Sequence, residues 1–383
     1  MMLLGLVLHS AASYPLTALG DAWPYHDVHT SALLDPVIFL IHLFRMPTFF
    51  VMAGFFAALL FYREGVSGFL WHRTKRLLLP LSVAWMVLYP PMVFGFTLAQ
   101  MGDGVDDFAA AMQVTIAAPY QLASLAHLWF LYYLFIFCVM AALVVPLLEW
   151  LPAAARARVT SAFGRLVPTA VGCVLVGVLS GLTMLPMNGP MLDTPTSLVP
   201  ALRVLAAYAV FFSFGWLLFV RRDLVSSFGQ HPWRYLNAGL VMSVMYLASV
   251  LQSPLTSPTA NHVLVVMLGG VAMWLLVYGV IGVFVRYAEH PSPLQRYAAD
   301  ASYWIYLVHL PVVAVLAGLL APADAPGLAK FVLVLTGTTV ITVATYHRFV
   351  RSGAIGAFLS GRRFPPGLPR EEPVGVVTRV KES

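Results

Sequence analysis

Apolar segments long enough to cross a membrane recur along the whole chain. Nine of them lie near residues 38–62, 77–99, 128–149, 166–186, 199–220, 235–253, 262–286, 303–321 and 328–349. Each has about the 20 consecutive apolar residues that a transmembrane helix needs. The pattern therefore predicts an all-α fold, a polytopic helical bundle that is embedded in a lipid bilayer.

The first apolar run is shorter than the other nine. It extends from Met1 to Tyr14, where Pro15 ends the helix. A helix of this length covers about 20 Å of a hydrocarbon core about 30 Å thick. We expect either a span completed by residues upstream of this chain or a partial span. A signal peptide is disfavoured because no basic stretch precedes the apolar run. The expected total is about ten transmembrane helices, with the first one shortened.

Positively charged residues predict the orientation of the bundle. Arginine and lysine occur in the loops near 63–76, 150–165, 221–234 and 286–300, and neither occurs near 15–35, 100–125, 187–198 or 254–261. Because cytoplasmic loops carry the excess of Lys and Arg, both termini are predicted to be cytoplasmic. Lys330, beside the last outer loop, is the main exception.

Composition supports the same picture. The 383 residues are 60% hydrophobic and only 10% charged, whereas a soluble domain has about 25% charged residues. We expect one membrane domain over residues 1–350. The tail from 351 to 383 is rich in proline and charge and is predicted to be disordered and cytoplasmic. The net charge of +6 lies in particular loops, so it encodes topology and gives no reason to expect a nucleic-acid partner.

Common cofactor and metal signatures are missing from the sequence. There is no G-x-S-x-G elbow, Walker loop or dinucleotide fingerprint, and both cysteines, Cys138 and Cys173, fall within apolar runs. The outer loop between the first two spans contains Trp23, Tyr25, His26, Asp27 and His29. Its H-x-x-H pair has no third ligand in register, so no metal site is expected. Its aromatic rings are candidates for stacking on a sugar.

Ionisable residues gather at one depth near the outer side. By helical rise, His9 lies about 7–8 Å below the outer end of its helix, and His42, Arg45 and His127 are expected at the same level, with Trp129 beside them. Ionisable groups inside a membrane are costly and are functional candidates by default. For His42, Arg45 and His127, the alternative is an interfacial anchor that reaches water.

The stretch WHRTKRLLLPL places two arginines at the cytoplasmic start of the third span. Arg73 and Arg76 are three residues apart, so in a helix they would share a face. Paired guanidinium groups suit phosphates. The alternative is a plain positive-inside anchor.

The ninth expected span, counted with the short first run, begins DASYWIYLVHLP and contains Tyr306 and His309 on one helical face. His309 is expected about 10 Å inward from Ser302, on a route from the cytoplasmic mouth toward His9. Pro311 frees a backbone carbonyl that a neighbouring group has to satisfy. The alternative for His309 is a packed histidine bonded to another helix.

Taken together, five segments resemble acyltransferase family 3 of integral membrane proteins, and within it the branch of periplasmic glucan succinyltransferases. The segments are MLLGLVLH, HLFRMPTFFVMAGFF, RTKRLLLP, AHLWFLYYL and ASYWIYLVHLP. The resemblance implies transfer of an acyl group from cytoplasmic acyl-CoA to a carbohydrate hydroxyl across the membrane. It depends on a first-helix histidine, here His9, and an R-x-x-R pair, here Arg73 and Arg76. Two features depart from the family pattern: no cation precedes His9, and Ala53-Gly54 replaces the usual Ser-Gly.

The resemblance assigns roles to the candidate residues. His9 is the expected general base, since a neutral imidazole can accept a proton from a sugar hydroxyl, and an acyl-histidine relay stays open. Arg45 or His127 would polarise the carbonyl or orient the sugar. The substrates would be bound by the residues that line the route, which are Arg73, Arg76, Trp129, Tyr306 and His309.

The expected function is that of a membrane-bound O-acyltransferase in a bacterial inner membrane. It would use succinyl-CoA or acetyl-CoA as co-substrate, with no bound cofactor, and a glycan, best matched by a glucan, as acceptor. Partners in glucan synthesis stay open. The alternatives are a transporter or flippase for sugars or lipid-linked sugars, without acyl chemistry, and an inactive relative with a structural role.

Overall fold

The computed structural model describes residues 2–120, 124–288 and 292–361, and this part of the chain is helical with no strand. Its helices are α1 (Met2–Ala11), α2 (Leu34–Arg73), α3 (Leu79–Met101), α4 (Phe108–Ala117), α5 (Trp129–Leu148), α6 (Ala153–Leu166), α7 (Ala170–Met184), α8 (Leu202–Val220), α9 (Val225–Phe228), α10 (Pro232–Gln252), α11 (Pro258–Tyr287), α12 (Pro293–Leu320), α13 (Gly327–Thr345) and α14 (Ala354–Ser360). The prediction of an all-α, polytopic bundle is confirmed.

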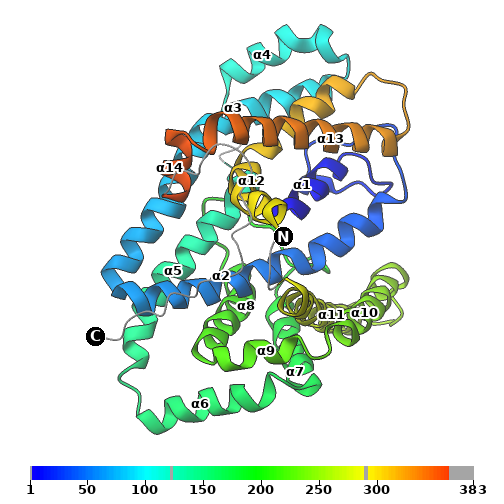
Figure 1. Ribbon diagram of the computed structural model, residues 1–383. Helices are drawn as coiled ribbons and strands as arrows, with labels where there is room; N and C mark the ends of the chain where they lie inside the picture. The colour runs from blue at the N-terminus through cyan, green and yellow to red at the C-terminus, as the bar shows by residue number, and fades with distance from the viewer. Residues whose placement is uncertain (1, 121–123, 289–291, 362–383) are drawn as a thin grey trace.

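Each of the ten expected segments falls on a helix, but fewer helices are both long enough and apolar enough to cross a membrane. The described residues contain seven such candidate spans, or eight if the bent pair α6 and α7 forms one. The helix α1 has only 10 residues, and α2 and α3 count together as one segment of 68 residues. A π-helical turn, Thr74–Leu78, joins α2 to α3. The break lies inside α2, at Gly65, and after it the helix runs back along the first part of α2, where Arg73 donates to the Phe56 carbonyl; Figure 1 shows this reversal near the end of α2.

Several helices extend into segments that the sequence predicted to be loops. The predicted loop near 63–76 is largely helical, with a break at Gly65, where φ is 69°. The predicted loop 150–165 contains α6, whose described residues are all at least partly exposed and whose axis is bent by 113° from α7. The helix α12 begins at Pro293, ten residues before its expected start, with a capping box between Ser292 and Gln295. These segments contain charged side chains that lower hydropathy without preventing a helix.

Part of the predicted disordered tail is ordered. The helix α14, Ala354–Ser360, lies within it and buries Leu359 to 7% exposure. The prediction of disorder was therefore wrong for residues 354–360, because a short apolar stretch, AIGAFL, precedes the proline-rich part. The tail beyond residue 361 lies outside the described residues.

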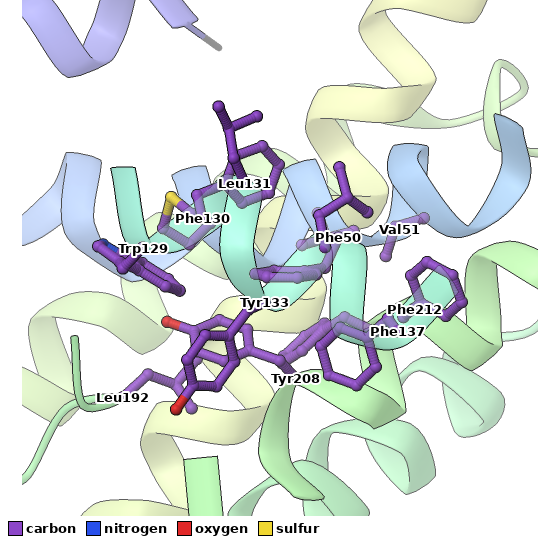
Figure 2. Packing of buried hydrophobic residues seen from close by; sticks show 14 of the residues in the cluster. Phe50, Val51, Trp129, Phe130, Leu131, Tyr133, Phe137, Leu192, Tyr208 and Phe212 are labelled. Atoms are coloured by element: carbon purple, nitrogen blue, oxygen red, sulfur yellow. The ribbon is translucent and has the colours of Figure 1, made fainter. Parts of the chain in front are cut away.

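The helices α2 and α8 cross at a close distance inside the bundle. A methyl group at Gly54 of α2 would collide with the Phe212 carbonyl of α8, and one at Gly215 would collide with the Val51 carbonyl. Small residues allow this close backbone approach in membrane helices. Aromatic rings fill the space beside the crossing, and Figure 2 shows them. The Phe50 ring, for example, lies 4.5 Å from that of Tyr208.

Candidate functional site

Three histidines from distant parts of the chain meet in one cluster. They are His9 on α1, His127 in the 3-10 turn Ala126–Leu128 before α5, and His309 on α12. The ring centroids of His9 and His309 are 5.0 Å apart and stacked, and the His127 ring is 5.1 Å from that of His309. Nδ1 of His9 and Nε2 of His309 share a hydrogen bond of 2.7 Å. The cluster is therefore one hydrogen-bonded and packed unit.

The position of His309 corrects a prediction of the sequence. His309 is in direct contact with His9, whereas the sequence placed it on a route leading there. The reason is the early start of α12 at Pro293. Sixteen residues separate Pro293 from His309, which is about 24 Å along a helix, so His309 reaches the level of His9.

Pro311 holds His127 in place through the backbone of α12. A proline has no N–H group, so the carbonyl of Leu307, four residues earlier, has no helical donor. The His127 ring supplies one, since its Nε2 donates to Leu307 O at 3.0 Å. The Tyr306 hydroxyl in turn donates to the His127 carbonyl at 2.8 Å. The freed carbonyl that the sequence predicted is thus satisfied by a second histidine of the cluster.

The backbone before His127 is strained. Ala126 has a φ of 45°, in the left-handed region that residues with a Cβ atom seldom adopt. Its N–H donates to Ser124 Oγ at 3.0 Å, which supports the turn. The strain bends the chain at the start of α5, so that the His127 ring points toward α12.

A small cavity opens beside the cluster. Its volume is about 20 Å³, room for about one water molecule. Six of the residues that the sequence singled out line it, together with Met2, Gly5, Met46, Phe49 and Phe130; the six are His9, Arg45, His127, Trp129, Tyr306 and His309. Residues of α1, α2, α5 and α12 thus surround one point.

Arg45 brings unused hydrogen-bond donors to this cavity. Its guanidinium passes close to α1 at Gly5, where a Cβ atom would lie only 2.6 Å from Nη1. Nη2 contacts Met46 Sδ at 3.5 Å, while Nε and Nη1 are buried without a partner among the described residues. A buried donor without a partner costs about 1–3 kcal/mol, and more when it is charged. Arg45 is therefore prepared to bind an oxygen atom of an anion or of a polarised carbonyl.

A tryptophan of the loop between α1 and α2 covers His9. The Trp23 ring stacks on the His9 ring at 5.6 Å with an interplanar angle of 20°. Its Nε1 donates to Ser13 Oγ at 2.9 Å, and its ring packs against Phe96. The sequence pointed to the aromatic residues of this loop but not to Trp23 in particular. Only the short distance along the chain from His9 could have suggested it.

A buried ion pair anchors the same loop. Lys330 of α13 donates to both carboxylate oxygens of Asp27, at 3.0 and 2.9 Å, and both side chains are fully buried. Tyr25 donates its hydroxyl to Asp27 at 2.8 Å. Burial, together with this hydrogen bond to Asp27, raises the pKa of the Tyr25 phenol, so Tyr25 stays protonated as a donor. Lys330, the exception in the charge pattern, thus forms a buried ion pair with Asp27 of this loop.

Arg73 and Arg76 do not line this cavity, and their side chains contact different neighbours. Arg73 donates to the Phe56 carbonyl at 3.1 Å, and its Nε is buried without a partner among the described residues. Arg76 donates to the carbonyls of Ala357 and Phe358, at 3.3 and 2.7 Å. The predicted shared face assumed an α-helix, but Arg76 lies in the π-helical turn, which changes the angle between the two residues.

His42 is also separate from the cluster. Its Nε2 donates to the Leu192 carbonyl at 3.3 Å, and it does not line the cavity. The expected group at one depth therefore contains His9, Arg45 and His127, with His309 in the place of His42. No group of three or more metal-ligating side chains that could hold an ion occurs in the described part of the chain.

The fold and the cavity define a multi-pass membrane protein with a polar, histidine-rich site inside its helical bundle. Residues 2–347 match the family described as acyltransferase domain, and the chain belongs to this family. It is similar to glucans biosynthesis protein C of Salmonella gallinarum, Salmonella paratyphi B and Salmonella dublin. Identity to each is 24%, over 96% of this chain and 93% of the relative. No solved structure matches. The protein is therefore a membrane acyltransferase that transfers groups other than amino-acyl groups.

Proposed function

We propose that this enzyme transfers a succinyl or acetyl group from cytoplasmic acyl-CoA to a hydroxyl of a glycan on the far side of a bacterial inner membrane. The family supports the acyl chemistry, and the name of the Salmonella relatives supports a glucan as acceptor. The observation that carries the proposal is the cavity in which His9 faces the unpaired donors of Arg45. A base and a cation beside one small space suit attack by a hydroxyl on a thioester.

In the proposed reaction, the sugar hydroxyl attacks the thioester carbonyl while His9 accepts its proton. The C–O bond forms, and the carbonyl oxygen becomes an oxyanion that accepts hydrogen bonds from Nε and Nη1 of Arg45. The C–S bond then breaks, and the CoA thiolate takes the proton from His9. A relay through an acyl-histidine remains an alternative with the same residues.

Arg73 and Arg76 would bind the nucleotide phosphates of the donor at the cytoplasmic mouth. Arg76 would then exchange the carbonyls of Ala357 and Phe358 for phosphate oxygens, which form stronger, charge-assisted bonds. The acyl arm would extend along α12 past Tyr306 toward His9. This assignment agrees with the charge pattern, which predicts that the loop near 63–76, with both arginines, lies on the cytoplasmic side.

The acyl group and the sugar do not fit into the cavity as it stands, because about 20 Å³ holds only a water molecule. The proposal therefore requires the helices and the loop around His9 to separate during the reaction. Trp23, which stacks on His9, is the side chain that the sugar would displace on the outer side. An aromatic ring in that position also suits stacking on a sugar.

The test is mass spectrometry of periplasmic glucans from cells that lack their own glucan acyltransferase. The cells would express the parent chain, the His9→Gln variant or a His262→Gln control at matched membrane levels. His262 lies at the start of another predicted span and bonds to the Leu185 carbonyl away from the cavity. We expect a mass increment, which identifies the acyl group, with the parent and the control only. An increment that survives His9→Gln would refute His9 as base, and no increment from the parent would refute a glucan acceptor.

A further inference from the structure

We propose that His309 is a positioning residue, which fixes the tautomer of His9 so that Nε2 of His9 is the basic atom. This inference rests on the proposed function of His9 as base. It follows from a chain of hydrogen bonds that begins at the backbone of α12 and ends at the cavity. No charged carboxylate takes part in this chain, unlike in a Ser-His-Asp triad.

The first step concerns the proton of His309. Its Nδ1 lies 3.0 Å from the Ile305 carbonyl and 2.7 Å from the Tyr306 carbonyl. Carbonyl oxygens only accept hydrogen bonds, so Nδ1 of His309 has to carry the proton. In a neutral imidazole the other nitrogen, Nε2, then has a free lone pair.

The second step passes this constraint to His9. Nδ1 of His9 lies 2.7 Å from Nε2 of His309, and an acceptor at that distance needs a donor. Nδ1 of His9 therefore carries the proton of the neutral ring, and Nε2 of His9 carries the lone pair. Which nitrogen of a histidine is protonated is commonly set in this way by the partner of the other nitrogen.

The surroundings keep His309 neutral. It is 1% exposed and lies among His9, His127, the Arg45 guanidinium and the Tyr306 phenol, with no carboxylate lining the cavity. A doubly protonated His309 would set its own N–H against the N–H of His9. It would also add a positive charge beside Arg45, which a buried site with no anion does not support.

The arrangement has a consequence for the reaction. When His9 accepts the hydroxyl proton at Nε2, its ring becomes an imidazolium whose Nδ1–H still donates to the lone pair of His309. The positive charge is thus stabilised by a neutral acceptor, and the ring keeps its orientation while the proton is passed on to the thiolate. His127 is built similarly, since its Nε2 donates to Leu307 O and its Nδ1 is buried without a partner among the described residues.

The test compares two substitutions of similar size, His309→Gln and His309→Leu. A glutamine can accept from Nδ1 of His9 through its side-chain oxygen, whereas a leucine cannot. The protein, labelled with ¹⁵N-histidine and held in lipid vesicles, would be studied by solid-state NMR, and the His9→Gln variant would identify the His9 signals. Initial rates of acyl transfer would be measured on the same samples.

We expect Nδ1 of His9 to be protonated in the parent and in His309→Gln, and a mixture of tautomers in His309→Leu. In a Ser-His-Asp triad the wrong tautomer costs about 10⁴-fold in kcat. We therefore expect His309→Leu to lower kcat by about 10-fold or more with little change in KM, and His309→Gln to recover much of it. A rate loss in His309→Leu with an unchanged tautomer would mean a merely structural role and would overturn the proposal.

Two further outcomes separate this inference from the proposed function. A His9 signal protonated at Nε2 in the parent would overturn the positioning role at once, without any need for a variant that folds. The expected tautomers in a parent that transfers no acyl group would leave the hydrogen-bond chain intact and would refute the proposed function instead.

Discussion

The histidine cavity and the arginine pair are both built from cationic and polar side chains, but they use their hydrogen bonds differently. In the cavity, Nε and Nη1 of Arg45 and Nδ1 of His127 are buried without partners among the described residues. At the arginine pair, Nε of Arg73 is likewise buried without a partner among the described residues, but Arg76 already donates to two carbonyls near the end of α14. A buried group without a partner is costly, so it tends to mark a place where a ligand supplies the missing bond. The cavity thus offers its free donors directly to a ligand, whereas Arg76 has to exchange partners before it binds one.

The two regions also differ in what covers them. The loop over His9 is anchored by the buried ion pair between Asp27 and Lys330. The helix α14 over Arg76 is held at this point by hydrogen bonds to backbone carbonyls. A phosphate can replace carbonyls as a partner of arginine, whereas separating the buried ion pair leaves a charge uncompensated. The loop over His9, the first cover, is thus more rigid than α14 over Arg76, the second cover.

The largest effect is expected from breaking the rigid cover. Lys330→Met removes the cation and leaves Asp27 buried without its counter-charge, which costs about 3–5 kcal/mol in the free energy of unfolding. Thermal unfolding in detergent, followed by circular dichroism, would measure it. We expect a marked fall in the midpoint temperature and a loss of acyl transfer, because the loop carries Trp23 over His9.

Two control variants sharpen this prediction. Adding Asp27→Asn to Lys330→Met removes the uncompensated charge and should recover part of the stability. Arg76→Ala, at the other cover, should change the midpoint much less, since it breaks only bonds to carbonyls. If Arg76→Ala were as destabilising as Lys330→Met, the two covers would be equally rigid and the comparison would fail.

The same two regions show what the sequence can and cannot predict. Hydropathy located the helices, and the cost of burying ionisable groups pointed to His9, Arg45, His127 and His309, with Trp129 and Tyr306 named beside them; all six line the cavity. The sequence could not show that His309 contacts His9. The charged residues of QRYAAD lower the hydropathy at the start of α12, so its first turns were not predicted as part of the span. Nor could the sequence show that Arg73 and Arg76 contact different neighbours, since the π-helical turn changes the angle that three residues make in an α-helix.

The second prediction addresses the unpaired donors of the cavity. Arg45→Gln removes the charge and most of the donors, and the loss of a donor to an oxyanion costs about 10²–10³-fold in kcat. Arg63→Gln is the matched control, because Arg63 lies on the same helix, is exposed and pairs with Glu64. Rates of acyl transfer in membranes would be measured for both. Equal rates for Arg45→Gln and the parent would show that the unpaired donors serve no step of the reaction.

The smallest effect is expected at the arginine pair, where Arg76 has to give up existing bonds before it binds phosphate. A charge-assisted hydrogen bond contributes about 1.5–3 kcal/mol, and the exchange of the carbonyl bonds reduces the net gain. We therefore expect Arg76→Ala to raise KM for acyl-CoA by about tenfold, with kcat nearly unchanged. Lys75→Ala is the control, since Lys75 lies in the same turn, is exposed and packs over the Trp71 ring.

A second substrate separates phosphate binding from a structural role of Arg76. Acyl-pantetheine carries the same thioester but lacks the nucleotide phosphates, so Arg76→Ala should leave its KM unchanged. If KM rose equally for both donors, Arg76 would act only by holding α14 against the bundle. The arginine pair would then be a second rigid cover, and the donor phosphates would have to be bound elsewhere. An effect confined to acyl-CoA would instead show that Arg76 binds the donor phosphates, apart from the histidine cavity.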